Sequence, residues 1–141
     1  MAAPGEGKER HSKNLQHSKG PERGAAVVDF VLIGALLTLL FLAIVQLTLI
    51  LHVRNTLIDA AASGARYGTL ADRNDGDAKE RTVQLITAAL NADFARDVGA
   101  SESTFQGIRT LEVTVRAPLP VIGFIGPRAL LEVKGHAAIQ R

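Results

Sequence analysis

The sequence predicts an α+β protein in which a long N-terminal transmembrane helix precedes a second helix packed on a small antiparallel sheet. Three patterns lead to this fold class. A charge-free apolar stretch runs from Phe30 to Leu51, apolar residues recur at helical spacing from Val83 to Phe94, and alternating stretches follow Thr110. The 141 residues leave room for one modest domain besides the membrane helix.

The chain divides at visible shifts in composition. We expect a disordered basic leader, a transmembrane helix with an extracytoplasmic extension, and a small extracytoplasmic α+β domain, over residues 1–24, 25–71 and 72–141 respectively. The leader is polar, contains Pro and Gly, and lacks apolar periodicity.

The net charge of +2 belongs to the leader, which has five basic residues against three Glu: Lys8, Arg10, Lys13, Lys19 and Arg23. A nucleic-acid-binding domain would carry its basic excess on folded structure with interleaved aromatic residues, so we expect no nucleic-acid partner. Cysteine is absent, which excludes disulfides, thiolate metal sites and a cysteine nucleophile. We expect neither a cofactor nor a metal.

The apolar stretch is long enough to cross a hydrocarbon core of ~30 Å, which takes about 20 residues. A signal peptide has a shorter apolar region of about 7–15 residues followed at once by small residues. Here Ala60 to Ala62 come only after His52, Arg54 and Asp59, so we favour a retained span. The excess of basic residues before the span predicts a cytoplasmic N-terminus and an extracytoplasmic C-terminal domain at the cytoplasmic (inner) membrane.

The helix is expected to continue past the membrane to Ala71, which would make it roughly 70 Å long if it starts at Ala25. Ala60, Gly64 and Gly68 recur every four residues and line one face, where another helix could approach closely. A surface helix that simply contains small residues is the other interpretation.

A charged turn, Asp72 to Asp77, precedes the second helix. Asp77 followed by Glu80 suggests an N-cap with a carboxylate at the third helical position. The apolar stripe then comprises Val83, Ile86, Leu90 and Phe94, and we expect the helix to end between Asn91 and Gly99. The clustered carboxylates lack the terminal Glu of a calcium-binding EF-hand loop, so a solvated turn is favoured.

Two strands are predicted from a period of two. Leu111, Val113 and Val115 alternate with polar residues over Thr110 to Arg116, and a second alternating stretch covers Leu131 to Ile139. A two-stranded ribbon is marginal, so we expect a third strand, for which Thr104 to Ile108 is the weak candidate, or packing against a helix.

The connection between these strands, Ala117 to Pro127, is apolar and contains three prolines. It could cap the core, touch the membrane or dock on a partner. His136 falls on the polar strand face without an obvious carboxylate or serine partner. A membrane-anchored hydrolase would need a nucleophile, a base and an orienting group, and we expect the protein not to be an enzyme.

Asp29 is a carboxylate at the start of the apolar span, where it is costly unless neutralised or paired. It could simply be an acid in the first helical turn, which the helix dipole stabilises. Alternatively, cleavage between Gly24 and Ala25 would create an ammonium at Ala25, which Asp29 of a neighbouring subunit could pair with to set axial register.

Two segments resemble the TadE-like family of tight-adherence (Tad) pilus-assembly proteins: ERGAAVVDFVLIGALLTLLFLAIVQL (Glu22 to Leu47) and LHVRNTLIDAAASGARYG (Leu51 to Gly68). The resemblance implies a minor pseudopilin-like component, cleaved by a prepilin peptidase after Gly24, that works with other pilin subunits and the pilus platform. Family members commonly have Glu where this chain has Asp29, which keeps the charge but shortens the side chain.

We therefore expect a structural pilus-assembly protein, incorporated into the fibre or priming its assembly. An uncleaved bitopic scaffold that binds an envelope partner is the alternative. A bulky residue in place of Gly24 distinguishes them, because only a pseudopilin needs maturation.

Overall fold

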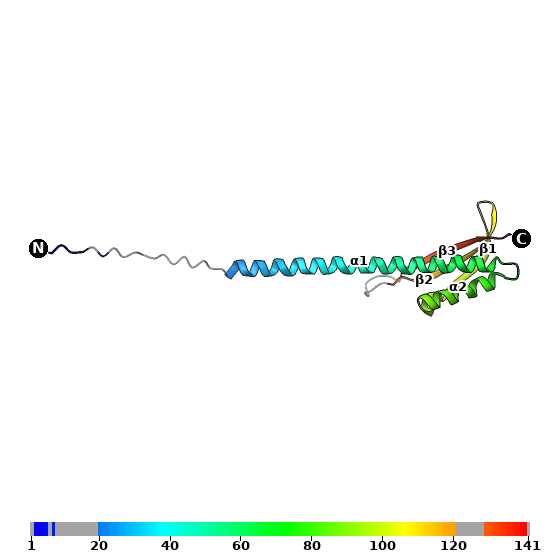
Figure 1. Ribbon diagram of the computed structural model, residues 1–141, viewed down its shortest axis with the longest axis horizontal. Coiled ribbons are helices and arrows are strands. Elements are labelled where there is room, and N and C mark those ends of the chain that lie inside the picture. Colours follow the sequence, from blue (N-terminus) through cyan, green and yellow to red (C-terminus); the bar gives the residue numbers. More distant parts are fainter. Residues whose placement is uncertain (1, 6, 8–19, 121–128, 141) are drawn as a thin grey trace. The chain divides into compact units, whose positions relative to one another are not determined.

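The computed structural model describes residues 2–5, 7, 20–120 and 129–140. The elements along the chain are helices α1 and α2, a short 3-10 helix η1, and strands β1 to β3 (Figure 1). Their bounds are Gly20–Gly68, Asp75–Ala89, Ala92–Ala95, Asp97–Phe105, Ile108–Pro118 and Leu130–Ala138. The predicted α+β class, with a long apolar helix, a second helix and an antiparallel sheet, is confirmed.

Helix α1 begins at Gly20, five residues before the predicted start at Ala25. Pro21 lies in its first turn, where the missing N–H costs nothing because no intrahelical acceptor exists there. The helix ends at Gly68 rather than Ala71, and the Thr69 N–H and hydroxyl both donate to the Arg66 carbonyl. Residues 20–24 are therefore helical, where the sequence predicted a disordered leader.

The cap of α2 differs from the prediction. Asn74, not Asp77, is the N-cap: its side chain accepts from the Asp77 N–H at 3.1 Å, and the Asp77 carboxylate accepts from the Asn74 N–H at 2.9 Å. This reciprocal pair is a capping box in which Asp77 takes the third helical position. The helix ends at Ala89, and Phe94 of the predicted stripe falls in η1.

The sheet has the order β1-β2-β3 with antiparallel neighbours. The third strand exists, but it runs from Asp97 to Phe105, so the candidate Thr104 to Ile108 was wrong. Gln106 and Gly107 form the hairpin turn with φ of 52° and 79°. Positive φ at both central residues suits the twist of a two-residue hairpin, which explains the glycine at the second position.

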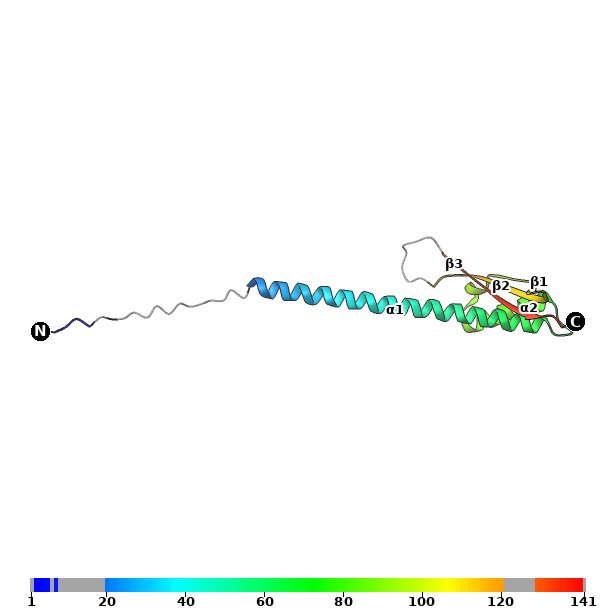
Figure 2. The same ribbon diagram turned by 90° about the horizontal axis from the view of Figure 1, so that it is seen from above.

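The chain forms two compact units, residues 1–39 and 40–141, and the core lies in the second. Figures 1 and 2 show the three strands running beside α2 and the C-terminal part of α1. The predicted inward set Leu111, Val113 and Val115 is fully or nearly fully buried. They pack in one cluster with buried residues of α1, α2 and the outer strands, among them Leu57, Ala61, Ile86, Val98 and Val133.

The predicted apolar connection lies only partly within the described residues. Ala117 is buried and Pro118 ends β2, whereas Leu119 and Pro120 are half-buried. Residues 121–128 lie outside the described part of the chain.

Candidate functional site

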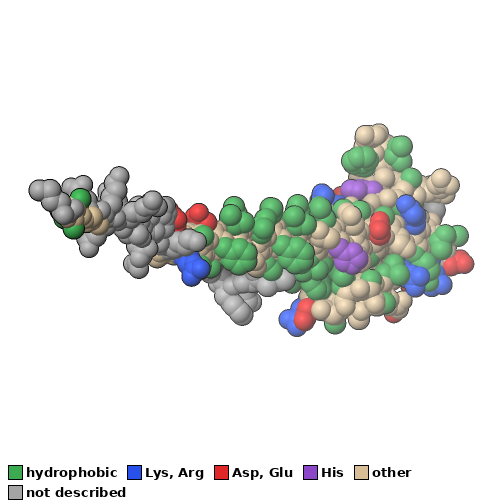
Figure 3. Space-filling model, turned by 60° about the vertical axis from the view of Figure 1, so that its left-hand side comes forward, with side chains coloured by type: hydrophobic (Ala, Val, Ile, Leu, Met, Phe, Trp, Pro, Cys, Tyr) green, Lys and Arg blue, Asp and Glu red, His purple; other side chains and the backbone are tan. Residues whose placement is uncertain are grey.

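The N-terminal part of α1, from Val27 to Leu51, exposes large apolar side chains, and Phe30 is 78% exposed. Figure 3 shows hydrophobic side chains along the visible face of this segment. The most apolar 18 residues of this helix include no buried residue. By length and composition, α1 is the one helix among the described residues that can cross a membrane. Because folded proteins rarely leave so large an apolar surface in water, another phase or molecule must cover it.

Gly24 and Ala25 lie in the second turn of α1 and Asp29 lies in the third, and all three are exposed. Because α1 begins at Gly20, the interpretation of Asp29 as an acid in the first helical turn was wrong for the uncleaved chain. A side chain added at Gly24 would meet nothing within 4 Å. Within the described residues, Asp29 forms no ion pair. The three residues are thus accessible to an enzyme or to a second subunit.

The small residues Ala60, Gly64 and Gly68 are all buried, and the two glycines face α2. A Cβ at Gly64 would lie 1.8 Å from Thr82 Oγ1 and 2.8 Å from the Ala78 carbonyl. A Cβ at Gly68 would lie 2.5 Å from Ala78 Cβ. Such separations are far inside van der Waals contact, so only glycine lets α2 lie this close.

A third close approach was not foreseen from the sequence. A Cβ at Gly135 of β3 would lie 2.4 Å from the backbone of Ala61 and Ala62 in α1. Gly135 occupies an inward position of the alternating pattern, between Val133 and Ala137. A glycine at a core-facing strand position is the available signal, because it often marks close backbone approach.

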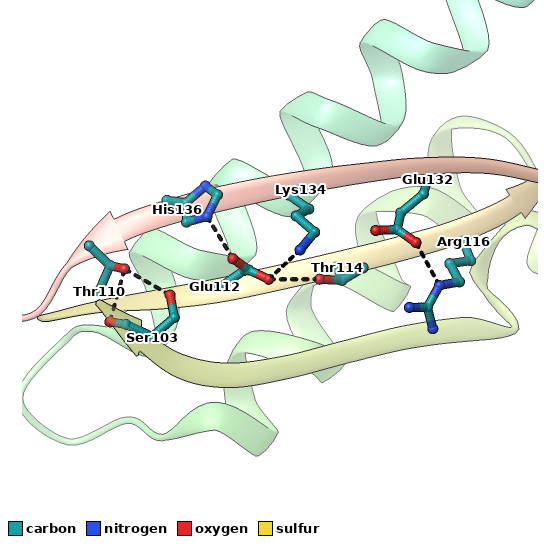
Figure 4. A network of polar contacts seen from close by, with 8 residues as sticks. All are labelled: Ser103, Thr110, Glu112, Thr114, Arg116, Glu132, Lys134 and His136. Carbon is teal, nitrogen blue, oxygen red and sulfur yellow. Dashed lines mark hydrogen bonds and ion pairs between the residues drawn. The ribbon is translucent and has the colours of Figure 1, made fainter. Parts of the chain in front are cut away.

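The outer face of the sheet carries a polar network centred on Glu112 (Figure 4). Its carboxylate accepts from Lys134 Nζ at 3.0 Å and lies 2.8 Å from His136 Nε2. Farther along the same face, Arg116 Nε donates to Glu132 at 2.8 Å. The carboxylate partner of His136 was not predicted from the sequence, because Glu112 is 24 residues away and only the strand register brings the two residues opposite each other.

This network stabilises its charged forms. Two hydrogen bonds lower the pKa of Glu112 below its ordinary value, and the bond from Lys134 has a larger effect than the bond from His136. The Arg116 guanidinium likewise lowers the pKa of Glu132, and Glu132 raises the pKa of Arg116. Both carboxylates therefore remain ionised at neutral pH.

The geometry around His136 does not assemble a hydrolytic centre. Its ring centroid lies 5.1 Å from that of Phe105, with the two ring planes tilted by 31°, and its Nε2 is hydrogen-bonded to Glu112. Among the described residues, no serine or threonine hydroxyl hydrogen-bonds to His136. The arrangement fits cross-strand pairing on a solvated sheet face.

Comparison with known families finds the model of the TadE-like protein family matching residues 24–66. Neither the curated proteins nor the solved structures contain a match. The matched residues lie wholly within α1, start at Gly24 and include Asp29, the apolar segment and the small-residue face up to Gly64. Helix α1 therefore carries a TadE-like segment, which confirms the resemblance over residues 24–66.

Proposed function

We propose that this protein is a minor pseudopilin-like structural component of a tight-adherence pilus or secretion apparatus. In this proposal, a prepilin peptidase cleaves it after Gly24. The observation that carries the proposal is a TadE-like segment that begins at Gly24 and continues as an exposed apolar helix with one carboxylate, Asp29, at its start. Before cleavage, α1 holds the chain in the cytoplasmic membrane, with the basic leader on the cytoplasmic side.

The position of Gly24 in α1 favours processing. Gly24 lies in the first two turns, where the helix has few intrahelical hydrogen bonds to open. Glycine also weakens a helix by about 1 kcal/mol relative to alanine. The backbone around the Gly24–Ala25 bond can therefore adopt an extended conformation in a peptidase active site. This change does not disturb the core, which lies in residues 40–141.

Cleavage changes the electrostatics of the helix start. The new Ala25 ammonium, with an ordinary pKa of about 8, is mostly charged at neutral pH. In the cleaved chain this ammonium lies at the positive end of the helix dipole, and the Asp29 carboxylate, four residues later, is brought close to that end, where the dipole favours negative charge. Pairing of Asp29 with the Ala25 ammonium of the next subunit would satisfy both charges and fix the register of apolar helices that slide easily past each other.

The partners that follow are the membrane, the prepilin peptidase, other pilin or pseudopilin subunits and the pilus platform. Removal of the leader also removes five basic residues from the cytoplasmic side. The remaining helix is then less firmly held in the membrane and can be drawn into a filament.

Maturation is tested by substituting Gly24→Leu and measuring the intact mass of the chain from the cell membrane. Gly20→Leu is the matched control, because both glycines lie in the first turns of α1 and neither has an atom within 4 Å of an added Cβ. We expect the wild type and Gly20→Leu to begin at Ala25, and Gly24→Leu to retain the leader and to lower pilus yield.

If all three chains retain the leader and support the same pilus yield, the proposal is wrong. That result would favour the uncleaved bitopic scaffold, in which the leader stays attached and the C-terminal domain binds an envelope partner.

A further inference from the structure

The connection between β2 and β3 starts beside the apolar part of α1. The Gln46 side-chain amide donates to the Pro120 carbonyl, although the two residues are 74 apart in sequence. Gln46 lies six residues before His52, within the charge-free stretch that ends at Leu51. At ~1.5 Å per residue, it is about 9 Å on the apolar side of His52.

The two described ends of the connection, residues 118–120 and 129–130, lie at nearly the same level. The Leu119 N–H donates to the Ala129 carbonyl at 3.1 Å, and Pro118 pairs with Leu130. Leu130 is five residues before Gly135, which touches Ala61. Five strand residues cover ~16 Å, which matches about 11 residues of helix, so Leu130 lies near the level of Leu51.

The side chains at this position are apolar, and one of them is largely exposed. Leu130 is 67% exposed, and Leu119 and Pro120 are half-buried. The charged groups nearest to Leu130 are mutually paired, Arg116 with Glu132 and Asp97, and Arg96 with Asp93. The apolar side chains are thus surrounded by charged groups that are already paired with one another. Such a surface can contact lipid without attracting anionic headgroups in particular.

We infer that the loop base, defined as Leu119, Pro120 and Leu130, rests in the outer interface of the bilayer beside α1. The contact continues the apolar surface of the membrane-spanning segment. Gln46 is then satisfied by the Pro120 carbonyl and not exposed as a bare amide to lipid. The inference needs only that α1 crosses the membrane, so it stands or falls separately from cleavage after Gly24.

The chain contains no Trp, which allows a single tryptophan to report depth without background. Leu130→Trp in the full chain is reconstituted into phosphatidylcholine vesicles whose acyl chains are brominated either near the headgroup or near the bilayer centre. Leu42→Trp, in the middle of the apolar stretch, shows that α1 is inserted. Ile108→Trp is the matched exposed control, since Ile108 is 58% exposed at the opposite end of β2.

We expect Leu130→Trp to emit at shorter wavelength than Ile108→Trp and to lose a several-fold larger share of its fluorescence to bromine near the headgroup. Leu42→Trp should be quenched most by bromine near the bilayer centre. Addition of salt should change neither result, because the contact is apolar. Ala129 is the neighbouring exposed residue, and Ala129→Trp should behave as Leu130→Trp does. Agreement between the two variants would show that the result does not depend on one particular substitution.

Two results would overturn the inference while Leu42→Trp remains quenched. One is water-like emission of both Leu130→Trp and Ala129→Trp without bromine quenching. The other is blue-shifted emission without bromine quenching, which would show that protein, such as a second copy of the chain, covers the loop base. If Leu42→Trp is itself not quenched, α1 does not span the bilayer and the inference fails with it.

Discussion

The two parts of helix α1 differ in whether their apolar side chains are exposed or buried. From Val27 to Leu51, large leucine, valine and phenylalanine side chains are exposed. From Val53 to Gly68, the buried residues are mostly alanine and glycine. Burial thus follows the available partner and not the size of the apolar side chain: α2 and the sheet cover the second part, whereas the first part needs a membrane or other subunits.

The family match spans both parts, from Gly24 to Arg66. It includes the proposed cleavage junction, the apolar segment and most of the small-residue face, but not α2 or the sheet. The following predictions test whether the two parts of α1 are as independent as this comparison requires.

The largest effect is expected from truncating a leucine in each part. Leu57 is 0% exposed in the core, so Leu57→Ala should destabilise the domain by about 2–5 kcal/mol, through lost burial and a cavity. Leu47 is 58% exposed, so Leu47→Ala should leave domain stability within about 0.5 kcal/mol of wild type. Denaturation in detergent micelles can be followed by the fluorescence of Tyr67, the only tyrosine in a chain without Trp. Equal effects of the two substitutions would break the comparison.

A smaller effect is expected from adding a methyl group to a glycine in each part. Gly64→Ala forces Cβ against Thr82 and the Ala78 carbonyl and should cost about 1–3 kcal/mol. Gly34→Ala meets nothing within 4 Å and should leave the Tyr67 unfolding transition unchanged. If Gly64→Ala is neutral in the same experiment, α2 does not pack on α1 as closely as described.

The smallest effect belongs to the polar network on the outer face of the sheet. Glu112→Gln removes a carboxylate that accepts from Lys134, and because Lys134 is partly exposed the loss should be about 1 kcal/mol or less. The pKa of Glu112 is lowered in the fold, so its stabilisation is present above the ordinary value of 4.5 and is lost as pH falls through the folded pKa.

Melting temperatures of the wild type and Glu112→Gln should therefore differ at pH 7 and converge in acid. A difference that grows toward low pH would contradict this assignment.

Local patterns predicted much of this fold. Strict alternation in β2 identified Leu111, Val113 and Val115 as core residues, and they are buried. The bounds of strand β1 were not predicted, because Gly99, Ala100 and Ser101 have little β propensity. Pairing with β2 decides the conformation of this segment. The capping box was misplaced by three residues because Asp77 is a plausible cap by itself, and only the backbone shows that Asn74 precedes the first turn.

The candidate site divides in the same way. Gly24, Ala25 and Asp29 could be named from spacing and resemblance because the role proposed for them depends on local sequence and a neighbouring molecule. The Glu112–His136 pair and the contact of Gly135 with Ala61 depend on strand register and on the distance between elements. The glycine at a core-facing position of β3 was the one local sign of these contacts, and it does not identify the residue that approaches it.

The central claim is that other subunits cover the apolar part of α1 in the assembled pilus, and that Asp29 sets their register by pairing with the Ala25 ammonium of a neighbouring subunit. The most direct test is the pilus yield of cells carrying Asp29→Asn, with Asp29→Glu as the charge-conserving control. The account predicts that Asp29→Asn is cleaved and folded but loses pilus assembly, and that Asp29→Glu restores it. Normal pilus yield from a processed Asp29→Asn chain would contradict the claim.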